Sequence, residues 1–337
     1  MDYTVAMQRA IALSEKGLGK TAPNPIVGAV IIDATGAIIA EGFHDRMRSS
    51  EHAEIVAIKA AGNRTQGSTI VVTLEPCNHI GKTDPCTKAI IEAGISTVVF
   101  AVNDPNSIAS GGADKLRSAG VKVIEGICRA EAEYSNRAWL IKIKKNRPFF
   151  TWKVAATLDG KVAATDGSSK WISNETSRAD VQTLRRQSDA ILVGTKTVVT
   201  DNPHLIPRGD FVGYTHNPMR IICGEQELPS DANIFDGAAT TQVVKTRDLD
   251  LLIEKLNESG INQVFVEAGP TLASAMLDHR LMDELVMYQA PSLLGSGKSF
   301  VGFGQESTIT DQLRLDHIST QVLDGDVKSV YRIRNGE

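Results

Sequence analysis

Three residues of the types that bind metal ions lie within one short part of the chain. His52 opens the segment His52-Ala53-Glu54, and Cys77 and Cys86 follow it, nine positions apart. One imidazole and two thiolates suit a single zinc ion and leave a fourth coordination position for water. Zinc lowers the pKa of such a water toward about 7, so hydroxide forms near neutral pH. Glu54 is close enough in sequence to move a proton from that water to a leaving amine.

The order of these residues follows the zinc deaminase signature, in which H-x-E precedes P-C-x-x-C. Here the second part is Pro76-Cys77 followed by Cys86, which makes the loop between the cysteines six residues longer. A lone His-x-Glu is usually an ordinary polar helix face, and a lone cysteine is usually a core residue. Four such residues in this order favour a catalytic zinc site. The alternative is a structural zinc site, which requires a fourth protein ligand and has no use for Glu54.

Three further polar residues are candidates for the same pocket. His79 lies in the loop between the cysteines and is either a substrate contact or a competing metal ligand. His44 follows a predicted strand and lines the pocket or the surface. Asn24, held between two prolines, either presents its amide to a heterocycle or serves as a turn residue.

Length and composition bound the kind of protein. The chain has 337 residues, which predicts about two domains, and 42% hydrophobic and 23% charged residues, which is typical of globular proteins. The net charge of −4 gives no indication of nucleic acid or an anionic membrane as partner. We find no apolar run long enough for a membrane span and no signal peptide, so we expect a cytoplasmic protein. Cys128 and Cys223 are expected to be small buried residues.

The first half of the chain alternates strand and helix patterns. Strands are predicted at 27–32, 37–42, 69–74, 96–102 and 121–126, and helices at 51–61, 85–93, 113–119 and 131–140. The turn composition of residues 33–36 predicts a hairpin between the first two strands. The alternation that follows predicts a sheet covered by helices, with its later strands parallel. A basic segment, 142–148, ends in proline and marks the domain boundary.

The second half is again an α/β pattern. Strands are predicted at 149–157, 190–194, 219–224 and 284–289, a helix at 177–188, and a strand, tight turn and helix across 263–279. No G-x-G-x-x-G follows a strand, so a Rossmann nicotinamide site has no support. The segment Gly295–Ser299 lacks the first glycine of a P-loop and is interpreted as a loop. The strand-to-helix turn at Gly269-Pro270-Thr271 is the best candidate for binding a phosphate.

Several motifs together resemble the bifunctional deaminase–reductase family of riboflavin biosynthesis. In the first half these are PNPIVG (23–28), HAE (52–54), TLEPCNHIGKTDPC (73–86) and NDPN (103–106). In the second half they are KVAATLDGK (153–161), SSKWIS (168–173), LRRQSDAILVGTKTVVTDNPHL (184–205) and VEAGPTLA (266–273). Two departures are visible: Asp84 stands where the family commonly has a proline, and the segment between Arg208 and Met219 is short.

The resemblance implies an N-terminal cytidine-deaminase-like α/β/α domain, residues 1–146, that binds one zinc ion. It implies a C-terminal dihydrofolate-reductase-like α/β domain, residues 147–337, that binds NADPH. The first would hydrolyse the 2-amino group of 2,5-diamino-6-(5-phosphoribosylamino)pyrimidin-4(3H)-one. The second would reduce the ribosyl group of the product to ribityl. A homo-oligomer, dimer or tetramer, is also expected.

Site residues of the second half follow from the same resemblance, motif by motif. The expected cofactor contacts are Ala155, Ser169, Trp171, Thr197, Asp201, Gly269, Pro270, Thr271, Leu272, Ala273, Ser274 and Ala275. The expected substrate contacts are Lys153, Arg185, Leu205, Arg208 and Glu267, together with Asn24, His44 and His79 of the first half. The rival hypothesis is a nucleic-acid or nucleoside zinc deaminase with an accessory domain. A nucleic-acid substrate is disfavoured by 5% aromatic residues and the negative charge.

Overall fold

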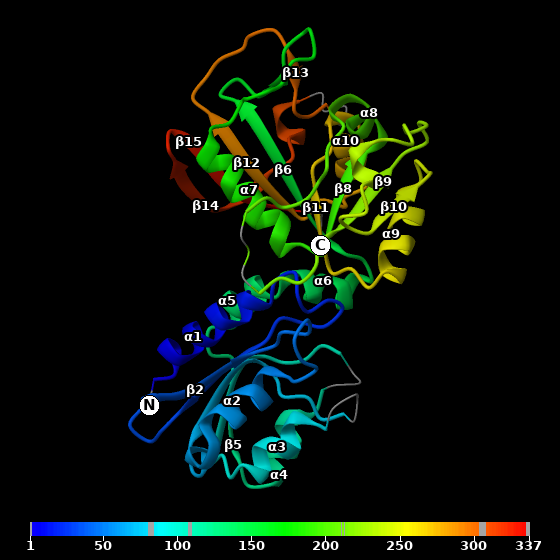
Figure 1. The fold of residues 1–337 in the computed structure, drawn as a ribbon. Helices are drawn as coiled ribbons and strands as arrows, with labels where there is room; N and C mark the ends of the chain where they lie inside the picture. Colours follow the sequence, from blue (N-terminus) through cyan, green and yellow to red (C-terminus); the bar gives the residue numbers. More distant parts are fainter. Residues whose placement is uncertain are drawn as a thin grey trace. The chain divides into compact units, whose positions relative to one another are not determined.

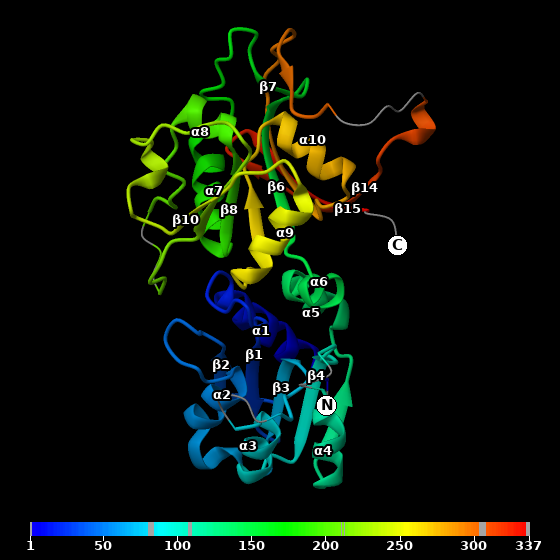
Figure 2. The same cartoon turned by 90° about the vertical axis from the view of Figure 1, so that its right-hand side faces the viewer.

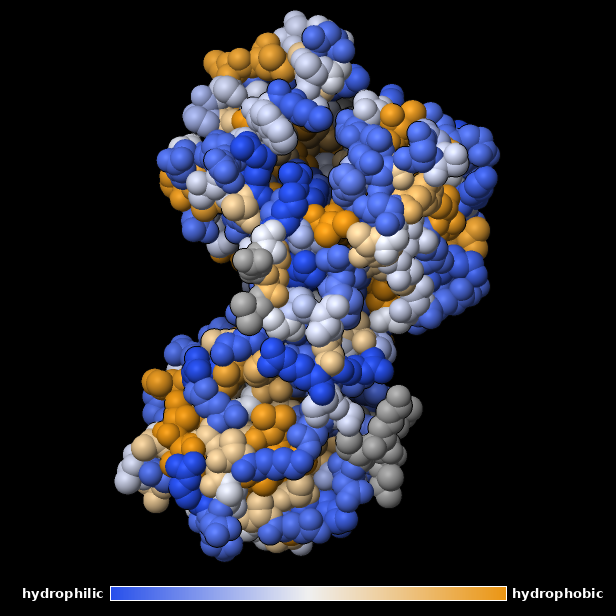
Figure 3. Space-filling view, in the orientation of Figure 1, coloured by the Kyte–Doolittle hydropathy of each residue, from blue (hydrophilic) through white to orange (hydrophobic). Residues whose placement is uncertain are grey.

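The computed structural model describes residues 2–79, 84–106, 110–209, 211, 213–302 and 308–334. The chain divides into two compact units, Met1–Asn146 and Arg147–Glu337, called here the first and second unit (Figures 1 and 2). In the described part of the chain no helix is long and apolar enough to cross a membrane. On the face shown in Figure 3, hydrophilic and apolar side chains are interspersed, and apolar ones cover a larger share of the first unit than of the second.

A five-stranded sheet with the order β2-β1-β3-β4-β5 forms the centre of the first unit. Its strands are β1 (Gly28–Ile32), β2 (Ile38–Phe43), β3 (Thr69–Leu74), β4 (Thr97–Val102) and β5 (Lys122–Glu125). The predicted hairpin is confirmed, because β1 pairs antiparallel with β2. β1 is also antiparallel to β3, whereas β3, β4 and β5 are mutually parallel, as the strand–helix alternation predicted.

Helices cover both faces of this sheet, because its strands are apolar on both sides. Ile31 and Val72 face a core shared with α2 (Ala53–Ala61), α3 (Cys86–Glu92) and α4 (Gly112–Ser118). Val30 and Val71, one residue earlier on the same strands, face α1 (Thr4–Ser14), α5 (Arg129–Ser135) and α6 (Arg137–Lys145). Successive strand residues point to opposite faces, so the continuous apolar runs require three layers.

The end of the first unit differs from the sequence prediction. One helix was expected at 131–140 with a basic segment after it, but the structure has α5 and α6, divided at Asn136, and α6 continues to Lys145. Trp139 and Leu140 of α6 are buried in the core. Three lysines occupy the last turn of α6, where cations interact favourably with the helix dipole. The basic segment therefore extends the helix, and Asn146, with φ of 49°, ends it.

The second unit is built on an eight-stranded sheet with the order β10-β9-β8-β11-β6-β12-β15-β14. The parallel strands are β6 (Phe149–Thr157), β8 (Ala190–Gly194), β9 (Met219–Cys223), β10 (Thr241–Val244), β11 (Gln263–Val266) and β12 (Glu284–Ala290). β14 (Leu315–Leu323) and β15 (Asp326–Ile333) complete it as an antiparallel hairpin. The sequence analysis missed this hairpin.

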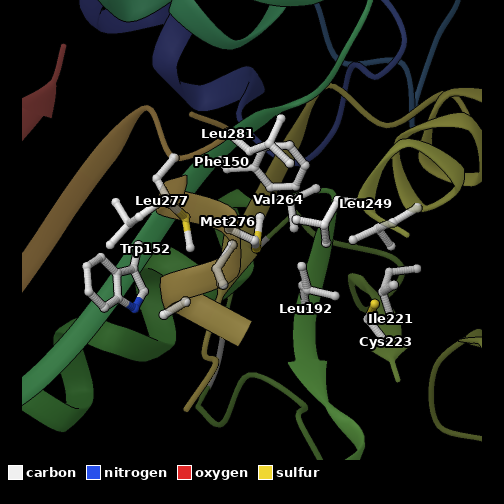
Figure 4. Close-up of a cluster of buried hydrophobic side chains, with 14 of the residues drawn as sticks. Phe150, Trp152, Leu192, Ile221, Cys223, Leu249, Val264, Met276, Leu277 and Leu281 are labelled. Carbon is white, nitrogen blue, oxygen red and sulfur yellow. The ribbon is translucent and has the colours of Figure 1, made fainter. Parts of the chain in front are cut away.

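Alternation along β6 decides what each face of this sheet carries. Phe150 and Trp152 point into the largest apolar core, which α9 (Leu249–Glu258) and α10 (Pro270–Asp278) cover (Figure 4). Lys153 lies between inward-facing residues of β6 and therefore points to the opposite face. The apolar clusters on that opposite face include residues of α7 (Glu175–Gln187) and α8 (Thr195–Asp201).

Candidate active site

His52, Cys77 and Cys86 come together in the first unit, and their ligand atoms all lie within 4.8 Å of one another. Nδ1 of His52 is 3.2 Å from Sγ of Cys86 and 3.5 Å from Sγ of Cys77. We call these residues the ligand trio. In the described part of the chain no fourth His, Cys, Asp or Glu joins this group.

The spacing of the trio fits a zinc ion. Zinc–nitrogen bonds of about 2.0–2.1 Å and zinc–sulfur bonds of about 2.3 Å at tetrahedral angles separate a nitrogen from a sulfur by about 3.6 Å. The two nitrogen–sulfur distances, 3.2 and 3.5 Å, are close to that value. An imidazole with two thiolates is also a donor set that zinc prefers.

Three different elements position the trio. His52 is the N-cap residue of α2, and Cys86 is the first residue of α3. Cys77 follows β3 by three residues and is held to α3, because the backbone N–H of Thr87 donates to its carbonyl at 3.3 Å. Two helix N-termini and one strand end therefore meet at the same edge of the sheet.

Glu75 fixes the loop that carries Cys77, a role that the sequence analysis did not assign. Its carboxylate accepts the backbone N–H groups of Asp104, at 3.1 Å, and Ala113, at 3.0 Å. Gly112 packs so closely on this loop that a Cβ there would lie 1.9 Å from the carbonyl oxygen of Pro76. The loop is thus held from both β4 and α4.

The trio shares its protons in the absence of metal. The hydrogen bond from Cys86 lowers the pKa of Cys77 to about 4, and the nearby imidazole of His52 lowers it as well. The hydrogen bond to Cys77 raises the pKa of His52 to about 8. The same sulfur contact, with burial, raises the pKa of Cys86 well above its usual value. A cation that replaces the shared proton would find one thiolate already formed.

Glu54 lies in the first turn of α2, beside the trio, and is 3% exposed. Burial raises the pKa of its carboxyl, although the positive charge of His52 opposes the shift. A carboxyl whose pKa is raised toward neutrality is suited to accept a proton and return it. The order H-x-E predicted this proximity from the sequence.

A cavity of about 390 Å³ opens beside the trio and is lined by His52, Glu54 and Cys77. The predicted contacts Asn24, His44 and His79 line it as well. Nδ1 of His44 donates to the carbonyl of Glu51 at 2.8 Å, so its Nε2 is left to accept from the amide of Asn24 at 3.3 Å. Burial lowers the pKa of His44, which favours this neutral form. Neither His44 nor His79 belongs to the ligand trio.

Several lining residues of this cavity were not predicted as site residues. Burial raises the pKa of one of them, Asp104, to about 6. Some of them belong to motifs that were noted without a role for these residues: PNPIVG (23–28), TLEPCNHIGKTDPC (73–86) and NDPN (103–106). The residues outside these motifs, Arg46, Ser50, Trp139 and Ile143, carry no local signature. The lining residues missed are Pro23, Pro25, Val27, Arg46, Ser50, Leu74, Glu75, Asp104, Asn106, Trp139 and Ile143.

The second unit holds a larger cavity of about 870 Å³. All five predicted substrate contacts of this half line it: Lys153, Arg185, Leu205, Arg208 and Glu267. Seven of the twelve predicted cofactor contacts line it as well: Ala155, Ser169, Trp171, Thr197, Asp201, Gly269 and Pro270. The other five, Thr271, Leu272, Ala273, Ser274 and Ala275, are outside its lining. They continue α10, and Ala273 is fully buried in the core because α10 turns that face to the sheet.

One ion pair dominates the electrostatics of the larger cavity. Arg185 of α7 donates through Nε and Nη2 to the two carboxylate oxygens of Glu267, the latter bond at 2.9 Å, and both side chains are 13% exposed. Burial tends to raise the pKa of Glu267, but Arg185 and Lys153 outweigh it and the pKa is lowered. Burial lowers the pKa of Lys153, and the charge of Arg185 lowers it further.

At both departures from the family pattern, the structure shows contacts with other residues. Asp84 forms an exposed ion pair with Lys88 at 2.8 Å. The short segment after Arg208 packs on the buried guanidinium of Arg186, which lies 5.0 Å from the ring centre of Phe211 and 5.4 Å from that of Tyr214. Residues 210 and 212 of this segment are outside the described ranges.

No helix begins in the described residues 300–302, directly after the segment Gly295–Ser299 that superficially matched a P-loop. Its backbone N–H group at Gly295 donates to Asp159 at 2.7 Å. Lys298–Ser299 forms the short strand β13, which pairs with β7 (Lys161–Ala163). A P-loop joins a strand to a helix, so this segment is not a P-loop. The interpretation as a loop holds for residues 295–297, whereas residues 298–299 form a strand.

Two family models match the chain in the order of its units. Residues 2–102 match the cytidine and deoxycytidylate deaminase zinc-binding region, and residues 148–329 match the RibD C-terminal domain. The riboflavin biosynthesis protein RibD of Mycobacterium tuberculosis is 41% identical over 324 residues, which are 96% of this chain and 95% of that protein. The chain belongs to the RibD family.

Other RibD proteins agree in sequence and in structure. The RibD of Escherichia coli is 37% identical over 324 residues, covering 86% of this chain and 88% of its own. The Acinetobacter baumannii RibD structure superposes with a TM-score of 0.90 and 35% identity, covering 98% of each chain. A structure from Thermotoga maritima superposes with a TM-score of 0.89 and 35% identity, again covering 98% of each chain. It is described as a diaminohydroxyphosphoribosylaminopyrimidine deaminase/5-amino-6-(5-phosphoribosylamino)uracil reductase.

Membership of the RibD family confirms the class of protein that the sequence motifs indicated. The chain is a mixed α/β enzyme of riboflavin biosynthesis that combines deaminase and reductase activities. Its N-terminal half has the cytidine-deaminase type of zinc-binding region, and the ligand trio lies within that matched range. Its C-terminal half, which contains the larger cavity, matches the reductase domain.

Proposed function

We propose that residues 1–146 form a zinc-dependent deaminase domain and residues 147–337 form an NADPH-dependent, dihydrofolate-reductase-like domain. The first acts on 2,5-diamino-6-(5-phosphoribosylamino)pyrimidin-4(3H)-one, and the second reduces the ribosyl group of the deaminated product to ribityl. The observation that carries this proposal is the ligand trio with buried Glu54 at the wall of one cavity. We also propose that the chain is a cytoplasmic homo-oligomer, a dimer or tetramer, which light scattering after gel filtration would test.

In the deaminase, His52, Cys77 and Cys86 hold the zinc ion. When bound there, zinc supplies the Lewis acidity that makes water nucleophilic near neutral pH. Glu54 takes a proton from the attacking water and delivers it to the departing 2-amino group, which leaves as ammonia. Asn24 and His44, which are hydrogen-bonded to each other, orient the pyrimidine ring, and His79 contacts it from the loop between the cysteines.

In the reductase, the cavity of about 870 Å³ is within the range of small-molecule and cofactor pockets. Gly269, the N-cap residue of α10, lines the cavity and has open space where a Cβ would lie, so a cofactor phosphate could approach the helix N-terminus there. When bound, NADPH supplies hydride to the sugar carbon. Lys153, whose pKa burial lowers, provides a proton to a sugar oxygen, and Arg208 binds the substrate phosphate.

The decisive experiment gives the protein the pyrimidine substrate and follows ammonia and nicotinamide absorbance separately. We expect ammonia without NADPH, and oxidation of NADPH only after deamination. Glu54→Gln should stop ammonia release while zinc stays bound. Glu51→Gln is the matched control, because Glu51 lies three residues away and pairs with Lys59 at the surface. Unimpaired ammonia release by Glu54→Gln would refute the proposed role.

Metal removal separates the catalytic from the structural interpretation of the zinc site. Apolar cores cover both faces of the first sheet, so we expect a chelator to abolish ammonia release and leave the circular dichroism spectrum unchanged. A structural zinc would instead unfold the first unit when it is removed. Added zinc should restore activity.

A further inference from the structure

The cavity beside the ligand trio has a buried end and an exposed end. Cys77 and Glu54 are 9% and 3% exposed, so the reacting groups lie at the buried end. Arg46 and Ser50 line the same cavity and are exposed. If the pyrimidine reacts at the trio, its ribosyl phosphate must extend toward the exposed end. This reasoning rests on the proposed deaminase function.

Arg46 is held in place at that exposed end. Its Nη1 donates to the carbonyl oxygen of Ala22 at 2.7 Å, and Ala22 directly precedes the lining segment Pro23–Pro25. Among the described residues Arg46 forms no ion pair with a carboxylate, whereas its neighbour Arg48 lies 3.6 Å from Asp45. The one contact to Ala22 leaves the other guanidinium N–H groups available to a ligand.

The other charges of the cavity wall make Arg46 the natural anchor for an anion. Of the lining residues that the structure describes, Arg46 is the sole arginine or lysine. The carboxylate of Glu75 is engaged by two backbone N–H groups, and burial raises the pKa of Asp104 to about 6. A guanidinium also matches a phosphate with two parallel hydrogen bonds.

We propose that Arg46 binds the 5-phosphate of the deaminase substrate and makes this half of the enzyme selective for phosphorylated pyrimidines. The residue acts on binding and lies at the other end of the cavity from the reacting carbon. It should therefore affect KM and leave kcat unchanged. The chemistry recognised is a phosphate monoester on a ribosyl group.

The test measures ammonia release by the full zinc-loaded chain, without NADPH, from the substrate and from its dephosphorylated form. For Arg46→Ala we expect KM for the phosphorylated substrate to rise about tenfold or more, equivalent to at least about 1.4 kcal/mol. KM for the dephosphorylated form should not change, and Arg46→Lys should keep part of the preference. Arg48→Ala is the matched control, because it removes the same charge from the same loop outside the cavity lining.

Two results would overturn the inference: no rise in KM for the phosphorylated substrate, or an equal rise for both compounds, which would show that Arg46 only supports the loop at Ala22. Ammonia release from neither compound by the unmodified chain would instead defeat the proposed deaminase function. In that case the affinity for ribose 5-phosphate tests the role of Arg46. It is measured in chains that also carry Arg208→Ala, which weakens phosphate binding at the reductase site. Weaker binding after Arg46→Ala supports the inference, and equal binding rejects it.

Discussion

Replacing Glu54 by glutamine should separate zinc binding from catalysis. The cavity wall holds two other carboxyl groups, but Glu75 is engaged by two backbone N–H groups and Asp104 accepts the N–H of Asn106 at 2.8 Å. Both carboxylates hold backbone N–H groups of loops, whereas Glu54 stands on α2 directly beside the ligand trio. The variant should therefore lose the whole contribution of a positioned base, about 10²–10⁴-fold in kcat. That loss corresponds to about 2.7–5.4 kcal/mol in the activation barrier.

The same substitution should not destabilise the metal-free protein. Burial raises the pKa of Glu54 in the folded chain above its ordinary value of 4.5. At pH values between the unfolded-state pKa and the folded-state pKa, the folded chain therefore binds more protons than the unfolded chain. The free energy of unfolding must then fall as pH rises through this interval, and the ionised carboxylate costs stability above it. Glutamine has the same shape and no charge, so it removes this pH-dependent cost.

Two measurements check the reasoning on Glu54. Ammonia release gives kcat, and elemental analysis should find one zinc per chain in both proteins. For the zinc-free proteins we measure the difference between the thermal unfolding midpoints of Glu54→Gln and the unmodified chain. This difference should be equal or more favourable to the variant at pH 7 than at pH 4. Retained turnover, or a clear loss of stability at pH 7, would show that Glu54 is a structural residue.

Three further predictions follow from the geometry. Cys86→Ser should abolish zinc binding and ammonia release, whereas oxidation of NADPH with the deaminated intermediate should continue. Gly112→Ala places a Cβ 1.9 Å from the carbonyl of Pro76, so zinc affinity measured by competition with a chelator should fall although the residue touches no ligand. Asp283→Ala leaves Arg147 buried without its two bonds of 2.7 Å, and calorimetry should show a loss of about 3–5 kcal/mol in the second unit. That loss equals about 6–20 °C in Tm, and a shift below about 2 °C would contradict it.

The C-terminal hairpin shows a feature that the sequence contained and the sequence analysis overlooked. Asp324 and Gly325 connect β14 and β15 with φ values of 51° and 96°. An Asp-Gly pair with both residues at positive φ is a strong signal for a two-residue hairpin turn. The division of the expected helix at Asn136 had no such signal in the sequence. Asn136 has φ of −98° and ψ of 18°, and its side chain accepts the backbone N–H of Ile26, 110 positions away, at 3.3 Å.

The sequence by itself determined the chemistry of the first site and its class of fold. A histidine two residues before a glutamate at a helix start places these two side chains close together by local geometry. The order of the later cysteines matches a zinc-site signature, although their contact with His52 spans 25 and 34 positions and is tertiary. Strand and helix periodicity likewise determined the two α/β halves. These features depend on neighbours in sequence, which backbone hydrogen bonding and alternation place in a fixed relation.

Only the tertiary structure decided which distant groups share a site. Arg185 and Glu267 are 82 positions apart, and Glu75 holds Ala113 across 38 positions, so no local pattern encodes either pairing. Arg46 was overlooked for the same reason, because an arginine in a loop is usually a solvated charge. It becomes a candidate anchor only when folding brings its loop to the wall of the cavity that holds the trio.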